Sequence, residues 1–262
     1  MNNAEVAINL GQNCIEGGTI LKKGITLSEL LTQKDIEHDE TAIKELRLIL
    51  EQNQHLSHVG VVFILPQKEP NTGGVFRRVK IDENTVIPTV FIVSEDADHI
   101  KKLFNTRRSS AERIAKLLGI NFEDMSPKLL RQFIIAHEFG HANDYVRNYE
   151  ENPDYKGAEA AEEWGVHYEM NLQTMPVRGL DPVELQEEIA NFQNLADFLN
   201  TYPEETKTIN RDIIKSLEDL VKAQEQAYRS SEYERYADKF AIDFIRKNVQ
   251  ALNVTELQFM EK

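Results

Sequence analysis

The chain has 262 residues, a formal net charge of −14 and a single cysteine, Cys14. So acidic a chain, with no basic patch beyond short pairs such as Arg77-Arg78, is not expected to bind nucleic acid or an anionic membrane surface. One cysteine cannot form an intrachain disulfide. No run approaches about 18 apolar residues, and the N-terminus shows no basic segment followed by an apolar core. We therefore expect a cytoplasmic protein that is not inserted into a membrane, with export by a signal-independent route left open.

The first segment, residues 1–55, is predicted to be polar at first and then helical. The helical pattern is found around 27–31 and 42–50, with Thr26 or Ser28 as a possible helix cap.

The next segment, residues 58–94, is predicted to contain the strands. Its three apolar runs are 59–65, 75–81 and Val86–Val93. The third run contains Pro88, which has no N–H to donate to a neighbouring strand, so we expect Val86–Val93 at an edge of the sheet. There its unpaired backbone groups would accept an extended peptide by strand addition.

Residues 97–149 are predicted to be helical, with a break near 119–124. A new helix is expected to start at Ser126-Pro127. The serine hydroxyl can accept from an exposed N–H, and the proline has no N–H that needs a partner. No proline interrupts the sequence from there to about Tyr149.

The middle of this helix reads H-E-F-G-H. His137 and His141 are four residues apart, so they lie one turn apart on one helix face and can bind the same tetrahedral zinc ion. They continue an apolar stripe from Leu130 and Ile134, and we expect them to face the core. Glu138 then lies beside the metal, where it can take a proton from zinc-bound water, whose pKa zinc lowers towards 7. The alternative is a pair of core or capping histidines without a metal.

Residues 150–250 are predicted to be almost wholly helical, with a helical insertion at 183–228 whose charges are mostly solvated. A catalytic zinc needs a third protein ligand and leaves its fourth position to water. The best candidates are Glu234 and Asp238 in S-S-E-Y-E-R-Y-A-D-K-F-A, because they are four residues apart and border an apolar stripe. One carboxylate would bind zinc, and the other would accept the N–H of a ligating histidine.

H-E-F-G-H followed by E-R-Y-A-D-K-F-A resembles the gluzincin metallopeptidases, in which H-E-x-x-H is followed by E-x-x-x-D on a later helix. The second motif is similar to that of peptidase family M48 and of the ImmA/IrrE-type peptidases, and H-E-F-G-H-A-N-D-Y resembles the active-site helix of the anthrax lethal factor type. The resemblance covers these two helices and is specific for the class, not for one family. It implies that His137, His141 and Glu234 bind zinc, that Glu138 is the general base, and that Asp238 orients a ligand.

The sequence departs from these families in several respects. The M48 enzymes are largely membrane proteins, and the stretch between His141 and Glu234 is longer than in ImmA-type chains. Thermolysin-like spacing would place the glutamate at 160–161, where this chain has alanines. In addition, Ser231-x-x-Glu234 fits a helix capping box, in which the glutamate has a structural role. The other candidates for the third ligand are Glu159, Glu162, Glu163 and His167.

A peptidase also needs a donor for the oxyanion that forms on the scissile carbonyl. The candidates are Tyr228, Tyr233, Tyr236, Tyr168 and His167. We prefer Tyr228, six residues before Glu234, although a tyrosine in a helix more often packs against the core.

These features predict one α+β, zincin-like domain over residues 1–262. It would have an N-terminal helical segment (1–55), a small mixed sheet packed on the active-site helix (58–149), and a mainly helical C-terminal part (150–250). We expect a zinc metallopeptidase, specifically an endopeptidase acting on protein or peptide substrates. Two alternatives stay open. One is a zincin-like binding, toxin-associated or structural protein with little turnover, which an intact Glu138 disfavours; the other is a zinc hydrolase of non-peptide bonds.

Overall fold

The computed structural model of the chain forms two compact units, one of Met1–Val166 with Arg235–Lys262 and one of His167–Glu234. The boundary at Glu234 falls inside a continuous helix, α9 (Glu232–Lys247). The structure describes residues 9–10, 13–14, 25–26, 40–64, 72–80, 85–93, 97–106, 108–173, 189–195 and 203–257.

A six-stranded mixed sheet with the order β2-β1-β5-β6-β4-β3 lies in the first unit. Three of its strands are long: β4 (Gly60–Ile64), β5 (Gly74–Lys80) and β6 (Val86–Val93). β6 runs parallel to β4 and antiparallel to β5. These strands coincide with the three predicted apolar runs, whose β-branched and aromatic residues suit a pleated, buried surface. The predicted α+β class and the mixed sheet are confirmed.

The prediction that Val86–Val93 forms an edge strand is wrong, because β6 lies between β4 and β5 and pairs with both. Pro88 lies opposite Arg78 of β5, but the ladder with β4 begins one residue later, where Thr89 faces Gly60. On the β4 side, Pro88 therefore precedes the ladder and its missing N–H costs no strand hydrogen bond.

Short strands extend the sheet at both edges, and the sequence patterns did not predict them. Two-residue strands carry too little periodicity to be recognised. Thr26, predicted as a helix cap, pairs with Gly60 instead. The helix predicted around 27–31 lies outside the described residues, whereas the one predicted around 42–50 is confirmed as α2 (Glu40–Gln52). The short strands are β1 (Asn9–Leu10), β2 (Asn13–Cys14) and β3 (Ile25–Thr26).

The helix that follows the predicted break begins as expected. Gly119 has a φ of 83°, which favours glycine. Ser126 Oγ then accepts from Leu129 N–H at 3.1 Å and caps α5 (Pro127–Tyr145), whose first residue is the proline. The elements on either side of α5 are η1 (Gln54–Leu56), α3 (Ala97–Thr106), α4 (Arg108–Leu118), η2 (Phe122–Asp124), the π-helix η3 (Val146–Glu150) and α6 (Ala158–Gln173).

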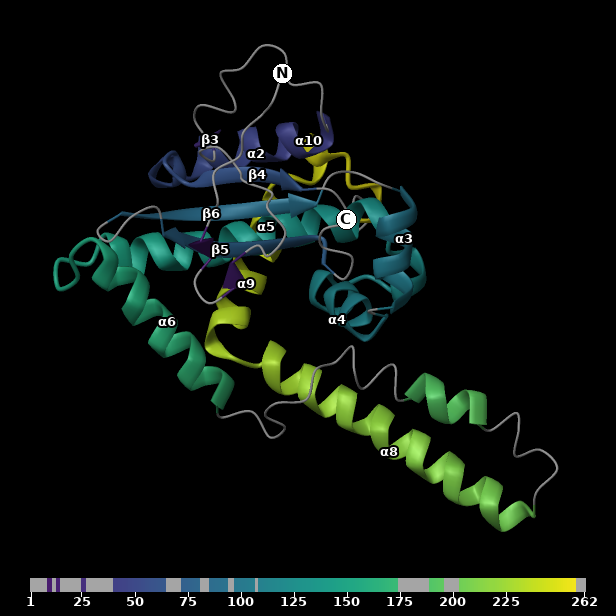
Figure 1. The fold of residues 1–262 in the computed structure, drawn as a ribbon. Coiled ribbons are helices and arrows are strands. Elements are labelled where there is room, and N and C mark those ends of the chain that lie inside the picture. The colour runs from purple at the N-terminus through teal and green to yellow at the C-terminus, as the bar shows by residue number, and fades with distance from the viewer. Residues whose placement is uncertain are drawn as a thin grey trace, which may run out of the picture. The chain divides into compact units, whose positions relative to one another are not determined.

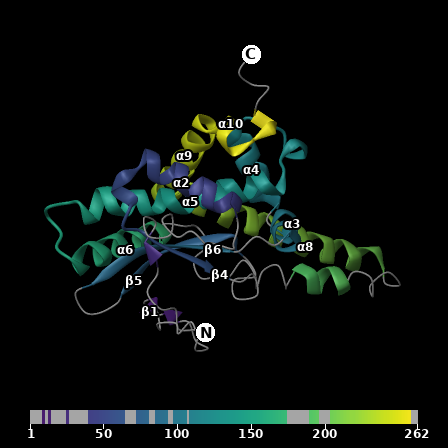
Figure 2. The same cartoon turned by 90° about the horizontal axis from the view of Figure 1, so that it is seen from above.

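α5 is the central helix of the first unit. It contacts β5 and β6, and Figure 1 shows it running behind these strands. In the turned view, α2, α5 and α9 lie on the same side of the sheet (Figure 2). From Leu129 to Tyr145 every residue of α5 is buried except Ile134 and Glu138. A helix buried on nearly all sides belongs to the core, so its two less buried positions identify the direction in which the site opens.

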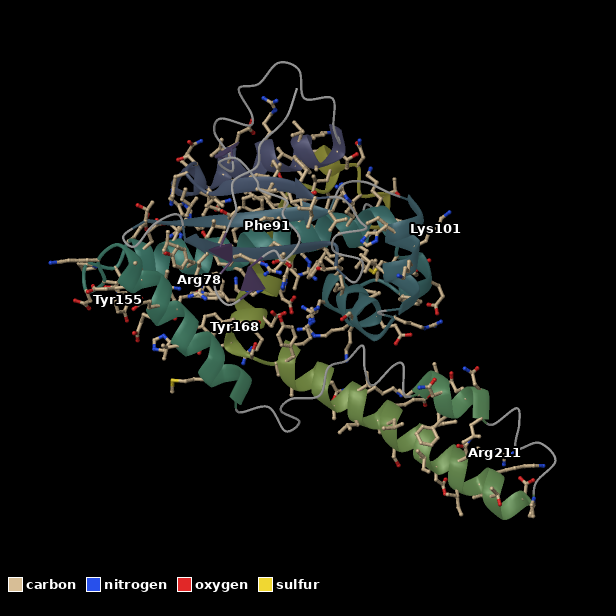
Figure 3. The ribbon with its side chains drawn as sticks, in the orientation of Figure 1. Arg78, Phe91, Lys101, Tyr155, Tyr168 and Arg211 are labelled. Carbon is tan, nitrogen blue, oxygen red and sulfur yellow. The ribbon has the colours of Figure 1, made fainter. Side chains whose placement is uncertain are left out.

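Side chains from the sheet also fix neighbouring elements of the first unit. Phe91 of β6 is buried in the core, and Arg78 of β5 extends to α6, where its guanidinium donates to the carbonyl of Ala161 (Figure 3). The same guanidinium lies 4.6 Å from the ring centroid of Trp164. These contacts hold the start of α6 against β5.

The second unit is helical in its described parts. It contains α8 (Glu204–Arg229) and a short helix at 189–195, which are joined by a hydrogen bond from Asn210 Nδ2 to the carbonyl of Phe192 at 3.1 Å. The predicted insertion, 183–228, falls within this unit. Among the described residues, no helix combines the length and apolar character needed to span a membrane. The chain then continues through α9 to α10 (Val249–Leu252) and η5 (Thr255–Leu257).

One exposed ion pair makes the stability of the fold depend on pH. His58 Nε2 lies 2.7 Å from Glu150 Oε2, and this hydrogen bond raises the pKa of His58. The pair therefore stabilises the fold fully below about pH 6.5, the ordinary pKa of histidine, and this contribution disappears as the pH rises through the raised pKa. We expect His58→Gln to lower the free energy of unfolding by at most about 1 kcal/mol, because both side chains are partly exposed.

Urea unfolding of the wild type and of His58→Gln, in mildly acidic and in alkaline buffer, measures this difference. The loss should be confined to the acidic buffer. An equal loss in both buffers would show that His58 acts through packing.

Candidate metal centre

His137 and His141 of α5 and Glu234 of α9 form a group that could hold a metal ion. Each offers one ligand atom, and these atoms all lie within 4.8 Å of one another. The three residues are only 5%, 7% and 1% exposed. Two imidazoles and one carboxylate are a ligand set found in catalytic zinc sites. In such sites the bonds to zinc are roughly 2.0–2.2 Å long, and the fourth coordination position is open to water. The residue types, their proximity and their burial all fit a metal ion.

A close approach between α5 and α9 brings these residues together. A Cβ atom built on Gly140 would lie 2.6 Å from the Cα atom of Ala237 and 2.9 Å from its carbonyl oxygen, so only glycine fits here. Gly140 directly precedes His141, and Ala237 directly precedes Asp238. The glycine of H-E-F-G-H thus allows the two helix backbones to touch beside the His-His-Glu group.

The two carboxylates of α9 have different partners. Asp238 Oδ1 lies 3.0 Å from His137 Nδ1, so Nε2 is the nitrogen of His137 that remains for a metal. His137 and His141 lie with their ring centroids 4.7 Å apart and their planes at 89°. Glu234 is therefore the carboxylate of α9 that belongs to the group that could hold a metal ion, and Asp238 contacts one histidine of that group. The spacing of the two carboxylates left this division open, and the resemblance to gluzincins implied it.

Asp238 is held from its other side by Arg113 of α4, whose Nη2 donates to Oδ2. Burial raises the pKa of Asp238, but the hydrogen bonds and charges of His137 and Arg113 outweigh it and lower the pKa below its ordinary value. Asp238 is thus held as a carboxylate at only 3% exposure.

Glu138 lies beside the ligands on α5 but faces β5. Its Oε2 accepts from the backbone N–H of Phe76 at 2.7 Å. A Cβ atom on Gly74 would lie 3.1 Å from Glu138 Cγ, so the glycine leaves room for this side chain. Glu138 is partly exposed while His137 and His141 are buried. Glu138 is therefore a carboxylate that a bound molecule could reach.

Glu234 fits both roles considered from the sequence, a residue of the helix capping box and a third metal ligand. Its backbone N–H donates to Ser231 Oγ at 3.4 Å, a long contact of the capping-box type. Its side chain meets Arg229 instead, with Nη1 2.5 Å from Oε2. Because the cap uses the backbone and the metal group uses the carboxylate, the two roles are compatible.

The candidates for the oxyanion donor have different surroundings. Tyr233 is buried and packs edge-on against Tyr168 at 5.9 Å between centroids, and the Tyr236 hydroxyl accepts from Asn143 Nδ2 at 2.7 Å. Both contacts indicate packing roles. For Tyr228, burial and then the charge of Glu234 raise its pKa well above 10, and its side chain also hydrogen-bonds to Glu234. The role of Tyr228 as oxyanion donor stays a prediction.

Comparisons of the chain with protein-family models, with curated proteins and with solved structures found no match. The resemblance to gluzincins is therefore carried by two motifs and not by an overall likeness. The structure itself, independently of any related protein, shows a buried His-His-Glu group that could bind a metal ion.

Three groups of the site have no motif that predicts them. They are Arg113, Arg229 and the backbone N–H of Phe76. Arg113 and Phe76 lie on elements far from α9 and α5 in sequence, so only tertiary packing brings them in. Arg229 gave a weak local signal, since an arginine in the last turn of a helix, five residues before Glu234, is within reach of it.

Proposed function

We propose that this protein is a zinc metallopeptidase of the gluzincin type, acting as an endopeptidase on protein or peptide substrates. The observation that carries the proposal is the meeting of His137, His141 and Glu234 from two helices, with Glu138 next to the first histidine. A scaffold that only bound metal would have no use for a reachable carboxylate at this position. A structural zinc site would also take a fourth protein ligand.

Zinc, when bound, would lower the pKa of water towards 7 and polarise the carbonyl of the scissile bond. The residues of the chain would do the rest. Glu138 takes the proton of the attacking water and later delivers it to the leaving amine. Asp238, whose Oδ1 lies 3.0 Å from Nδ1 of His137, would keep this histidine in the required tautomer and leave Nε2 for the metal. Tyr228 is the proposed donor to the oxyanion.

The proposed binding strand is β5, in place of the β6 expected from the sequence. β5 pairs with β6 along its whole length, and among the described residues its pairing with β1 joins Lys80 to Asn9. The N–H of Phe76 reaches Glu138 on the side away from β6. An extended peptide added along this side of β5 would pass the general base, which is the arrangement that cleavage requires.

Metal analysis tests the centre directly. Purified protein is expected to contain about one zinc per chain after reconstitution. His137→Ala should lose the metal, because two remaining ligands cannot hold the ion tightly. His99→Ala serves as the matched control, since His99 is also a buried histidine but bonds to the carbonyl of Thr72 at 2.9 Å. Absence of zinc from the reconstituted wild type, or full occupancy in His137→Ala, would refute the metal centre.

A further inference from the structure

Three side chains from three helices form a line that ends at the metal centre. Arg113 of α4 donates to Oδ2 of Asp238, and Asp238 of α9 places Oδ1 3.0 Å from Nδ1 of His137 on α5. Each oxygen of the carboxylate thus has a different partner. In these contacts the outermost member, Arg113, reaches His137 through Asp238.

The orientation of the Asp238 carboxylate depends on both partners. The terminal torsion of an aspartate is broad, so one contact alone does not fix which oxygen faces the histidine. A charge-assisted bond from a guanidinium is short and directional, and it holds one oxygen in place. Asp238 is 3% exposed, so water has little access to replace a lost partner. A buried carboxylate without its cation is also costly and tends to rearrange.

We propose that Arg113 is a positioning residue of the metal centre. It holds Asp238 so that His137 presents Nε2 to the ion in the correct ring orientation. The inference rests on the metal centre of the proposed function but goes beyond it, because no gluzincin motif covers α4.

Two effects of Arg113 on metal affinity have opposite signs. A guanidinium near a divalent cation repels it, so removal of this charge alone would tighten zinc binding. Removal of the anchor for Asp238 would weaken it, as changes in the groups behind zinc ligands typically do by about 10- to 100-fold. We expect positioning to dominate, because the carboxylate lies between the two cations and screens the repulsion.

The test is a competitive zinc titration against a chromophoric chelator, at one fixed pH above neutrality. Arg113→Ala is expected to bind zinc about 10- to 100-fold more weakly than the wild type. Arg113→Lys should be intermediate, because lysine restores a charged donor but not the planar fork. The matched control is Arg108→Ala on the same helix, where Arg108 is exposed and pairs with Glu112 at 2.7 Å. Its zinc affinity should equal that of the wild type.

A double variant separates positioning from general stability. If Arg113 acts through Asp238, then Asp238→Ala with Arg113→Ala should bind zinc no more weakly than Asp238→Ala alone. Additive losses, or an affinity of Arg113→Ala equal to or tighter than that of the wild type, would overturn the inference. Should Arg113→Ala fail to fold, Arg113→Lys and Arg113→Gln give the same comparison, and wild-type affinity in both would also overturn it. A wild type that binds no zinc would instead refute the metal centre itself.

Discussion

Glu138→Gln is expected to keep its zinc and its fold while losing cleavage of a susceptible protein by about a hundred- to ten-thousandfold, the usual value of general acid–base catalysis. Glutamine has nearly the same shape as glutamate, and its amide oxygen can still accept from Phe76 N–H, which lies 2.7 Å from the carboxylate. The ligands are other residues, so metal binding should hardly change. What is lost is the group that accepts a proton from water and returns it to the leaving amine.

This experiment also separates an enzyme from a binding protein. Wild type, Glu138→Gln and the control Glu112→Gln, an exposed glutamate of α4, would each be incubated with a cell extract and the newly formed protein N-termini identified. We expect new termini with the wild type and the control but not with Glu138→Gln. Equal cleavage by all three would exclude Glu138 as the base. No cleavage by any of them, with zinc bound, would favour the binding protein.

The helix that carries His137 and His141 was predictable because its signals are local. A serine followed by proline specifies where α5 begins, and the four-residue step from His137 to His141 specifies that both face one side. Each of these relations spans one or two helical turns. They need no tertiary partner, and the structure reproduces them.

The third ligand was predictable in part. The spacing of Glu234 and Asp238 and the stripe beside them indicate that both border the core, but not which one would meet a metal. Only the resemblance to gluzincins pointed to Glu234. That division follows from the contact of Gly140 with Ala237, which fixes the rotation of α9 against α5. A contact between two backbones leaves little trace in hydrophobic periodicity.

The order of the strands and the role of Arg113 could not be read from the sequence. Pro88 predicts an edge strand, because it removes one N–H from a run of apolar residues. The missing N–H removes a strand hydrogen bond only if Pro88 lies within the ladder to the neighbouring strand. Here the ladder between β6 and β4 begins at Thr89, one residue later. The role of Arg113 likewise cannot be predicted from the residues near it in sequence, because its partner Asp238 lies on another helix.

Gly140→Ala is expected to separate the two helices of the metal centre. The added Cβ would lie 2.6 Å from Cα and 2.9 Å from the carbonyl oxygen of Ala237, and backbone atoms cannot rotate away. Alanine would favour the helix by about 1 kcal/mol, but overpacking typically costs about 1–3 kcal/mol and here requires backbone movement. We therefore expect a net loss of stability. Since misplacement by about 1 Å can reduce a rate roughly a hundredfold, we also expect weaker zinc binding and a comparable loss of cleavage.

Gly165→Ala is the matched control, because Gly165 is also a helical glycine with a close neighbour. Its added Cβ would lie 2.6 Å from Nη1 of Arg78, the end of a flexible side chain that can move aside. The same gain in helix propensity applies to both substitutions. Gly165→Ala also disturbs the contacts of Arg78 with Ala161 and Trp164, so any larger loss in Gly140→Ala is a lower bound on the cost of the backbone contact. Thermal unfolding and zinc titration of both variants measure it. If Gly140→Ala matched Gly165→Ala in stability and zinc affinity, the close approach at Ala237 would not be what brings Glu234 to the two histidines.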